Sequence, residues 1–175
     1  MLHNHYSITL GAHGHEAAGV PLTESLLHRL GQMSLTKDVT PLVERHLAPV
    51  TLVTDNAIRR LSTKVPRLDL LAFVSRADVG GRPPLDNTES LAKIDAFSKR
   101  VSKLDLKDGP PKPLATGEHL IDVGLTPGPR FKELLAAVYD AQLDGSVSTE
   151  SEAVAMLRGL VAGHSRSQQS AQNSD

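Results

Sequence analysis

Histidine and acidic side chains gather near the start of the chain, in the segment His13-Gly14-His15-Glu16. Imidazole nitrogens and carboxylate oxygens can bind divalent metal ions when the fold brings further ligands to them. His46 and Asp78 are candidates for those further ligands. The spacing alone leaves two interpretations open, a metal site or ordinary polar residues.

Basic residues recur at helical spacing in two segments. The first segment holds Arg60, Lys64 and Arg67, and the second holds Lys93, Arg100, Lys103 and Lys107. Such stripes can neutralise RNA phosphates and release counterions. The alternative is a solvated helix face, because Asp95, Asp105 and Asp108 dilute the second stripe.

A turn at Thr126-Pro127-Gly128-Pro129 precedes a helical pattern in which Pro129 suits the first position. A helix that starts there points free backbone N–H groups outward, with the positive end of its dipole. We therefore expect a phosphate to bind at Gly128, with Arg130 and Lys132 beside it. An ordinary helical corner is the alternative.

The elements that must position these residues all have the periodicity of helices, and no long run alternates with period two. The prediction is an all-α fold. Helices are expected at about 16–30, 36–47, 54–64, 68–79, 91–104, 118–123, 129–144 and from 149 onward. Pro41 either opens the second helix after a Thr40 cap or kinks it. The fourth segment, 68–79, is nearly all apolar, so we expect it to be buried on most sides.

The clearest boundary is the segment DGPPKP at 108–113, which reads as a linker. It separates an expected body, residues 1–107, from an expected helical tail, residues 114–162. Residues 163–175 are polar and low in complexity, so we expect them to be disordered.

The overall composition excludes several classes of function. A net charge of −1 confines any nucleic-acid-binding surface to local patches. Aromatic residues make up 3% of the chain, so base stacking is not expected to be the main mode of binding. The chain has no cysteine, no signal-peptide pattern and no long apolar run, which fits a cytoplasmic protein with no membrane partner.

Three blocks, taken in order, resemble the bacterial CCA-adding enzyme and poly(A) polymerase family of tRNA nucleotidyltransferases. The blocks are HGHEAAG with VERH at 13–19 and 43–46, DNAIRR with SRADVGGR at 55–60 and 75–82, and TGEHLID with PGP and QLDG at 116–122, 127–129 and 142–145. The resemblance covers about residues 11–160. It implies a helical remnant of the second half of the HD (metal-dependent phosphohydrolase) region, followed by a small helical tRNA-binding tail.

The chain also departs from this family. Members begin with a nucleotidyltransferase head that carries a Gly-Ser turn and an Asp-x-Asp metal pair, and nothing in this chain resembles it. The His-Asp dyad of the HD region is also missing, and Leu2-His3-Asn4 is only a faint counterpart. The resemblance therefore leaves His15, His46 and Asp78 as metal ligands, holding a Mg, Mn or Ni ion weakly.

Three functions follow from this resemblance, and whether the chain is an enzyme stays open. The first is a headless protein that binds tRNA in tRNA 3′-end processing, as a truncated gene product or the partner of a separate nucleotidyltransferase head protein. Such a chain is not competent for nucleotide addition alone. The second is a metal-dependent phosphohydrolase acting on 2′,3′-cyclic phosphates or phosphomonoesters. The third is a non-functional remnant whose helices still pack.

Overall fold

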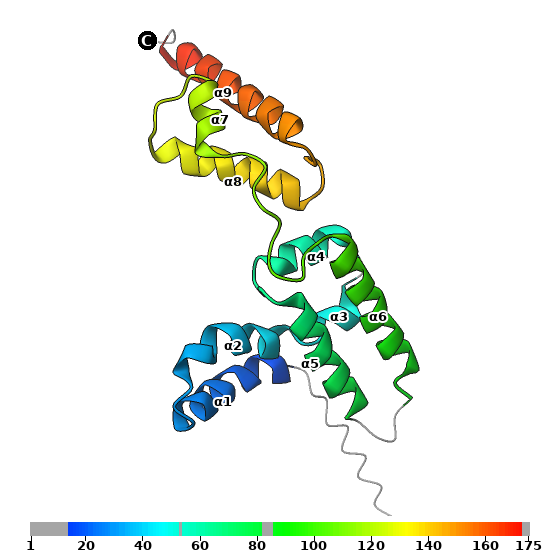
Figure 1. Ribbon diagram of the computed structural model, residues 1–175. Helices are drawn as coiled ribbons and strands as arrows, with labels where there is room; N and C mark the ends of the chain where they lie inside the picture. Colours follow the sequence, from blue (N-terminus) through cyan, green and yellow to red (C-terminus); the bar gives the residue numbers. More distant parts are fainter. Residues whose placement is uncertain (1–13, 53, 82–85, 173–175) are drawn as a thin grey trace, which may run out of the picture.

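The computed structural model describes residues 14–52, 54–81 and 86–172, with side chains described as far as Gly163. Within these ranges every regular element is a helix, so the all-α prediction is confirmed (Figure 1). The elements in chain order are α1 His15–Arg29, η1 Met33–Leu35, α2 Thr36–Arg45, α3 Ala48–Thr51, α4 Asp55–Ser62, α5 Leu68–Gly80, α6 Thr88–Lys103, α7 Gly117–Asp122, α8 Pro129–Leu143 and α9 Glu150–Gln172. None of the described helices combines the length and the apolar character that crossing a bilayer requires.

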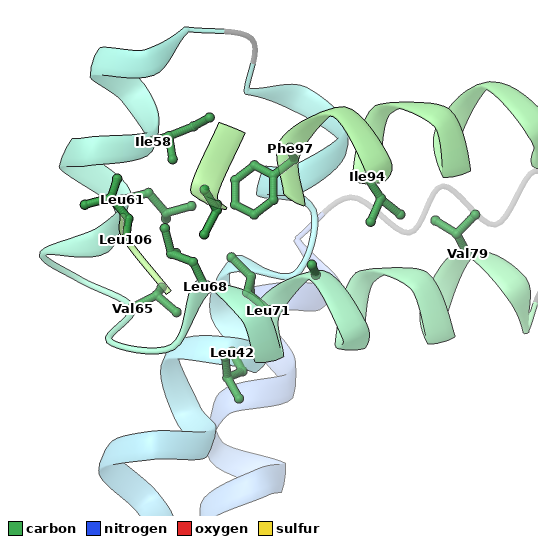
Figure 2. Packing of buried hydrophobic residues seen from close by; sticks show 12 residues of the cluster. Leu42, Ile58, Leu61, Val65, Leu68, Leu71, Val79, Ile94, Phe97 and Leu106 are labelled. Carbon is green, nitrogen blue, oxygen red and sulfur yellow. The ribbon is translucent and has the colours of Figure 1, made fainter. Parts of the chain in front are cut away.

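One hydrophobic core forms where α5 and α6 pack against each other and against α3 and α4. Ile94 and Phe97 lie on the side of α6 that faces α5, whose Leu68 and Leu71 are fully buried (Figure 2). The buried members of this core run along the chain from Leu42 to Leu106. This core positions the C-terminal ends of α2 and α5, from which two of the expected metal ligands project.

A second hydrophobic core lies among α7, α8 and α9. Its fully buried members include Leu120 of α7 and Leu157 of α9, and its buried residues run from Ala115 to Leu157. The two cores therefore share no residue, and the chain passes from one to the other through the segment 107–114. Whether each core folds as a separate domain, as the expected boundary at 108–113 requires, stays a prediction.

Side chains of α8 hold this connecting segment. The Tyr139 hydroxyl donates to the carbonyl oxygen of Pro111 at 3.0 Å. The Gln142 amide donates to the carbonyl oxygen of Lys112 at 2.8 Å and accepts from the Leu114 backbone N–H at 3.1 Å. Gln142 is 8% exposed, so its amide replaces water for two backbone groups. The segment is thus a strap tied to α8 and not a free linker.

We expect Gln142→Leu to lower the free energy of unfolding by about 1–3 kcal/mol, because it leaves the Leu114 N–H and the Lys112 carbonyl without these partners. Chemical denaturation followed by circular dichroism measures this loss. Ser146→Ala removes a bond from an exposed hydroxyl in the turn that follows and is the matched control. Equal stability of both variants would contradict the role assigned to Gln142.

Several element boundaries differ from those expected. Helix α2 begins at Thr36 and contains Pro41, so the interpretation in which Pro41 opens the helix is wrong. Packing of α1 along α2 holds the turn that Pro41 weakens. Helix α3 was not expected because its four residues are too few to show a period.

Helix α5 is less buried than its composition suggests. Leu70 and Phe73 are 37% and 68% exposed, because α5 packs through the side that carries Leu71, Ser75 and Val79. The expectation that α5 is buried on most sides is therefore wrong for its outer face. A nearly all-apolar sequence does not reveal which side of a helix lacks a neighbour.

Helix α9 continues to Gln172, so the described part of the segment 163–175 is helical where disorder was expected. The residues after Gly163 include no proline or glycine up to Gln172, and Ala, Gln and Arg are good helix formers. Polar composition shows that a segment cannot form a core, but it does not prevent a helix from extending.

Candidate functional site

The structure brings His15, His46 and Asp78 together from three helices. One potential ligand atom from each residue lies within 4.8 Å of the other two. His15 is the first residue of α1, His46 follows the last residue of α2, and Asp78 lies in the last turn of α5. His15 Nε2 is 2.8 Å from His46 Nε2, which in turn is 3.9 Å from Asp78 Oδ2.

The backbone around His46 fixes the orientation of its ring. His46 Nδ1 lies 2.7 Å from the carbonyl oxygen of Val43, which can only accept, so Nδ1 carries a hydrogen and donates it. His46 Nε2 then faces His15 and Asp78. The buried Ser75 hydroxyl donates to the backbone carbonyl of His46 and so ties the end of α2 to α5. Metal-binding histidines are commonly oriented by such a bond from the other ring nitrogen.

A further neighbour of this cluster is Glu16, with Oε2 3.5 Å from His15 Nδ1. The pKa of the Glu16 carboxyl is lowered, first by a hydrogen bond from its own backbone N–H and to a smaller extent by His15 and His46. Two imidazole nitrogens and one carboxylate oxygen form a donor set that suits divalent transition metals. The cluster fits a metal by donor chemistry and by the orientation of His46. His3, His5 and His13 lie outside the described residues.

The first basic stripe does not form an open cationic face. Arg60 of α4 makes a two-point contact with Asp144, with Nε–Oδ1 and Nη2–Oδ2 distances of 2.9 and 2.8 Å, and its Nη1 is 3.3 Å from Asp140. Arg67 pairs in the same way with Asp69 at 2.6–2.8 Å. Lys64 is exposed and lies beyond the end of α4. Arg60 therefore links α4 to α8 instead of facing solvent alone.

The second stripe is divided by the end of α6. Lys93 pairs with Glu89 at 2.7 Å, and Arg100 pairs with Asp55 at 3.4 Å. Helix α6 ends at Lys103, and the chain then turns through Asp105, which has a positive φ of 55°. Lys107 follows this turn, so the expectation that all four residues share one helix face is wrong. The spacing of three and four residues between the basic side chains does not show where α6 ends.

At the predicted corner, α8 begins at Pro129 as expected. Gly128 is extended, and its carbonyl oxygen accepts a bond from the Phe131 N–H at 3.0 Å. Arg130 is half-buried and Lys132 is exposed. Phosphate binding at Gly128 stays a prediction, as does RNA binding by the two stripes.

His119 makes two structural contacts that the sequence analysis did not predict. Its Nδ1 accepts from the Thr116 backbone N–H at 3.1 Å and so completes a capping box at the start of α7. Its Nε2 is 3.1 Å from Glu150 Oε1 at the start of α9. The sequence pattern that indicates this capping box is Thr116 followed three positions later by the polar residue His119.

We expect Asp144 to titrate below the ordinary range of an aspartate, because the hydrogen bond and then the charge of Arg60 lower its pKa. A lowered folded-state pKa means that the pair contributes stability above the ordinary pKa and loses it as the pH falls through the lowered value. Carboxyl-carbon NMR measures the midpoint, which should rise in Arg60→Gln. An unchanged midpoint in that variant would contradict the contact; Arg67→Gln, which affects Asp69 instead, is the control.

Over the part of the chain that the structure describes, the fold and the site thus comprise only helices, two hydrophobic cores and a cluster of two histidines and one aspartate. The chain is similar to the A-adding tRNA nucleotidyltransferase of Deinococcus radiodurans, with 31% identity over 153 residues that cover 83% of this chain. It spans about a third, 35%, of the length of that relative. This similarity supports a relationship with the tRNA nucleotidyltransferase family. No family model matches the chain, and no solved structure matches it significantly.

Proposed function

We propose that this chain binds tRNA and acts in tRNA 3′-end processing. The observation that carries the proposal is its 31% identity to an A-adding tRNA nucleotidyltransferase over 83% of the chain. A protein that acts on tRNA needs to hold a large, folded polyanion, and we assign part of that task to this chain. Contacts to phosphates and to the shape of the RNA, rather than base stacking, suit a chain with 3% aromatic residues.

Exposed lysines in both parts of the molecule support this proposal. Lys64 follows the end of α4, Lys103 is the last residue of α6, Lys107 begins the strap, and Lys132 lies in the first turn of α8 beside the Gly128 corner. Within the described residues none of these four has a carboxylate partner, in contrast to Arg60 and Arg67. A lysine without an internal partner can neutralise a phosphate without first breaking an ion pair.

We further propose that nucleotide addition requires a separate nucleotidyltransferase head. The sequence contains no Asp-x-Asp pair of the kind that holds the catalytic metals in that head. The chain by itself should therefore bind tRNA without extending it, which incubation with tRNA and labelled nucleoside triphosphates tests. Incorporation of label by the purified chain would contradict this part of the proposal.

Binding to tRNA is expected to weaken steeply as the salt concentration rises. Reversing one charge, as in Lys103→Glu or Lys107→Glu, should weaken binding further and reduce the slope of log K against log salt by about 0.7–1 for each lost phosphate contact. Fluorescence anisotropy with labelled tRNA measures both quantities. Lys37→Glu reverses an exposed charge on α2 and is the control for net charge. A flat salt dependence would contradict the proposal.

A second candidate function, a metal-dependent phosphohydrolase, is favoured by one specific observation. His15, His46 and Asp78 lie within 4.8 Å of one another and can hold a divalent ion such as Mg, Mn or Ni. A metal bound there would supply Lewis acidity toward a phosphate ester. His46 would be held for this role by its bond to Val43, and Asp78 would add a negative ligand. Metal-dependent hydrolysis of a 2′,3′-cyclic phosphate, compared with the His15→Ala and Asp78→Ala variants, tests this function.

A further inference from the structure

We propose that the pocket between α3 and α6 is a binding subsite for one unpaired nucleotide of an RNA. The pocket has a volume of about 320 Å³, near the lower end of the range for small-ligand pockets, roughly 300–1,000 Å³. It is lined by Val50, Leu52, Lys93, Ala96, Phe97 and Arg100. This inference rests on the RNA binding proposed above and names the part of the RNA that this pocket would hold.

The charged residues that line the pocket are both cations. Lys93 and Arg100 lie two turns apart on α6, and their side chains are 47% and 43% exposed. Their carboxylate partners, Glu89 and Asp55, do not line the pocket. Ion pairs at this level of exposure are weak, so a phosphate entering the pocket can compete for both cations. The pocket thus matches an anionic group in charge.

The other side chains that line the pocket are apolar. Val50 and Leu52 come from α3 and the residue after it, and Phe97 forms part of the buried core below. The flat face of a nucleobase is weakly hydrated, so apolar side chains such as these can pack against it. Among the described residues, no hydroxyl, amide or carboxylate side chain lines the pocket, so its side-chain hydrogen-bonding groups are the donors Lys93 and Arg100. When both cations contact phosphate, no side chain of the lining remains to read the base, so the expected ligand is a nucleotide of any sequence.

A second pocket, between α5 and α6, lacks this charge complementarity. Its volume is about 220 Å³, and its lining includes both Asp69 and Arg76. The carboxylate would oppose a phosphate as much as the guanidinium would favour it. The α3–α6 pocket is the one of the two that distinguishes an anionic ligand from a neutral one.

The test uses the full chain and a short, mixed-sequence single-stranded RNA carrying a fluorophore. Ala96→Leu narrows the pocket without changing any charge, and we expect it to weaken binding about tenfold. Ala92→Leu, one turn earlier on α6 and outside the pocket lining, should leave binding unchanged. Lys93→Gln should weaken binding more than Lys99→Gln, which removes the same charge from α6 outside the pocket. Thermal melting of each variant checks that it folds.

Two further measurements identify the occupant. Adenosine monophosphate should displace the RNA better than inorganic phosphate or an oligoglutamate peptide at equal concentration. A photoreactive thiouridine in the RNA should crosslink to residues 50–52 or 96–100.

The subsite is overturned if Ala96→Leu binds the short RNA as tightly as the natural chain does. It is also overturned if Lys93→Gln and Lys99→Gln weaken binding equally, or if oligoglutamate competes as well as the nucleotide. In each of these cases tRNA binding can persist, so the proposed function survives. If the natural chain binds neither the short RNA nor tRNA, the proposed function fails together with the subsite.

Discussion

Titration of the protein with Mn²⁺ or Ni²⁺ is expected to show one binding site whose affinity falls at least about 100-fold in His46→Ala. The reason is that His46 contributes its Nε2 to the cluster and is held in place by Val43, so its loss removes a ligand at the centre of the site. Even an outer-sphere partner of a ligand commonly changes metal affinity 10–100-fold. Isothermal titration calorimetry measures the affinity directly.

The control for this prediction is His28→Ala, which removes an exposed histidine from the last turn of α1. Metal that binds only the folded chain also raises its thermal stability, so the natural chain and His28→Ala should melt higher with metal. His46→Ala should show no such rise. Equal metal affinity in His46→Ala and the natural chain would remove both the metal site and the phosphohydrolase candidate that depends on it.

Leu120→Ala is expected to destabilise the core among α7, α8 and α9 by about 2–5 kcal/mol while leaving the core around α5 and α6 intact. Leu120 is fully buried among α7, α8 and α9, in a cluster that shares no residue with the core around α5. Leu71→Ala, at an equally buried position of α5, should have the opposite pattern. Hydrogen exchange resolved along the chain measures which helices lose protection in each variant.

The result also tests the predicted boundary at 108–113. Separate loss of protection in the two variants would support two folding units. Loss of protection in all helices together, in both variants, would show that the strap and the Arg60 ion pairs join the chain into one cooperative unit.

Features that depend on neighbouring residues were predictable from the sequence. Thr54 caps α4 by accepting from the Ala57 N–H at 3.2 Å, as its position predicts. Thr149 and Glu152 are three positions apart, a spacing that predicts a capping box, and they form it with bonds of 3.1 and 3.3 Å in the two directions. Pro129 opens α8 because its missing N–H costs nothing at the first helical position.

Features that depend on distant residues were not predictable in this way. Arg60 and Asp144 are 84 positions apart. Helical spacing placed Arg60 in a basic stripe, but it could not show that Arg60 forms an ion pair with Asp144. The strap bonds of Gln142 depend on how α8 lies along the connecting segment. Likewise, helical periodicity indicates a helix but does not identify the side that remains exposed, as Phe73 on α5 shows.

Spacing alone left the candidate metal cluster open against ordinary polar residues, and the resemblance then singled out the same three residues. His15 and His46 are 31 positions apart, and no local pattern requires their rings to meet at 2.8 Å. The structure places all three expected residues together, and it adds the bond from His46 to Val43 that orients the central ring. That bond joins residues three apart at the end of a helix, and a sequence pattern does not distinguish it from an ordinary last turn.

Helix α8 can transmit a force between the elements that it contacts at its two ends. Its 15 residues form a stiff rod roughly 22 Å long. One end begins at the Gly128 corner, and the other end holds the strap through Gln142 and α4 through Asp144. A force applied at the Gly128 corner would therefore be transmitted along α8 to the Arg60–Asp144 contact without unfolding the helix. An RNA bound at that corner would in this way act on the position of α4.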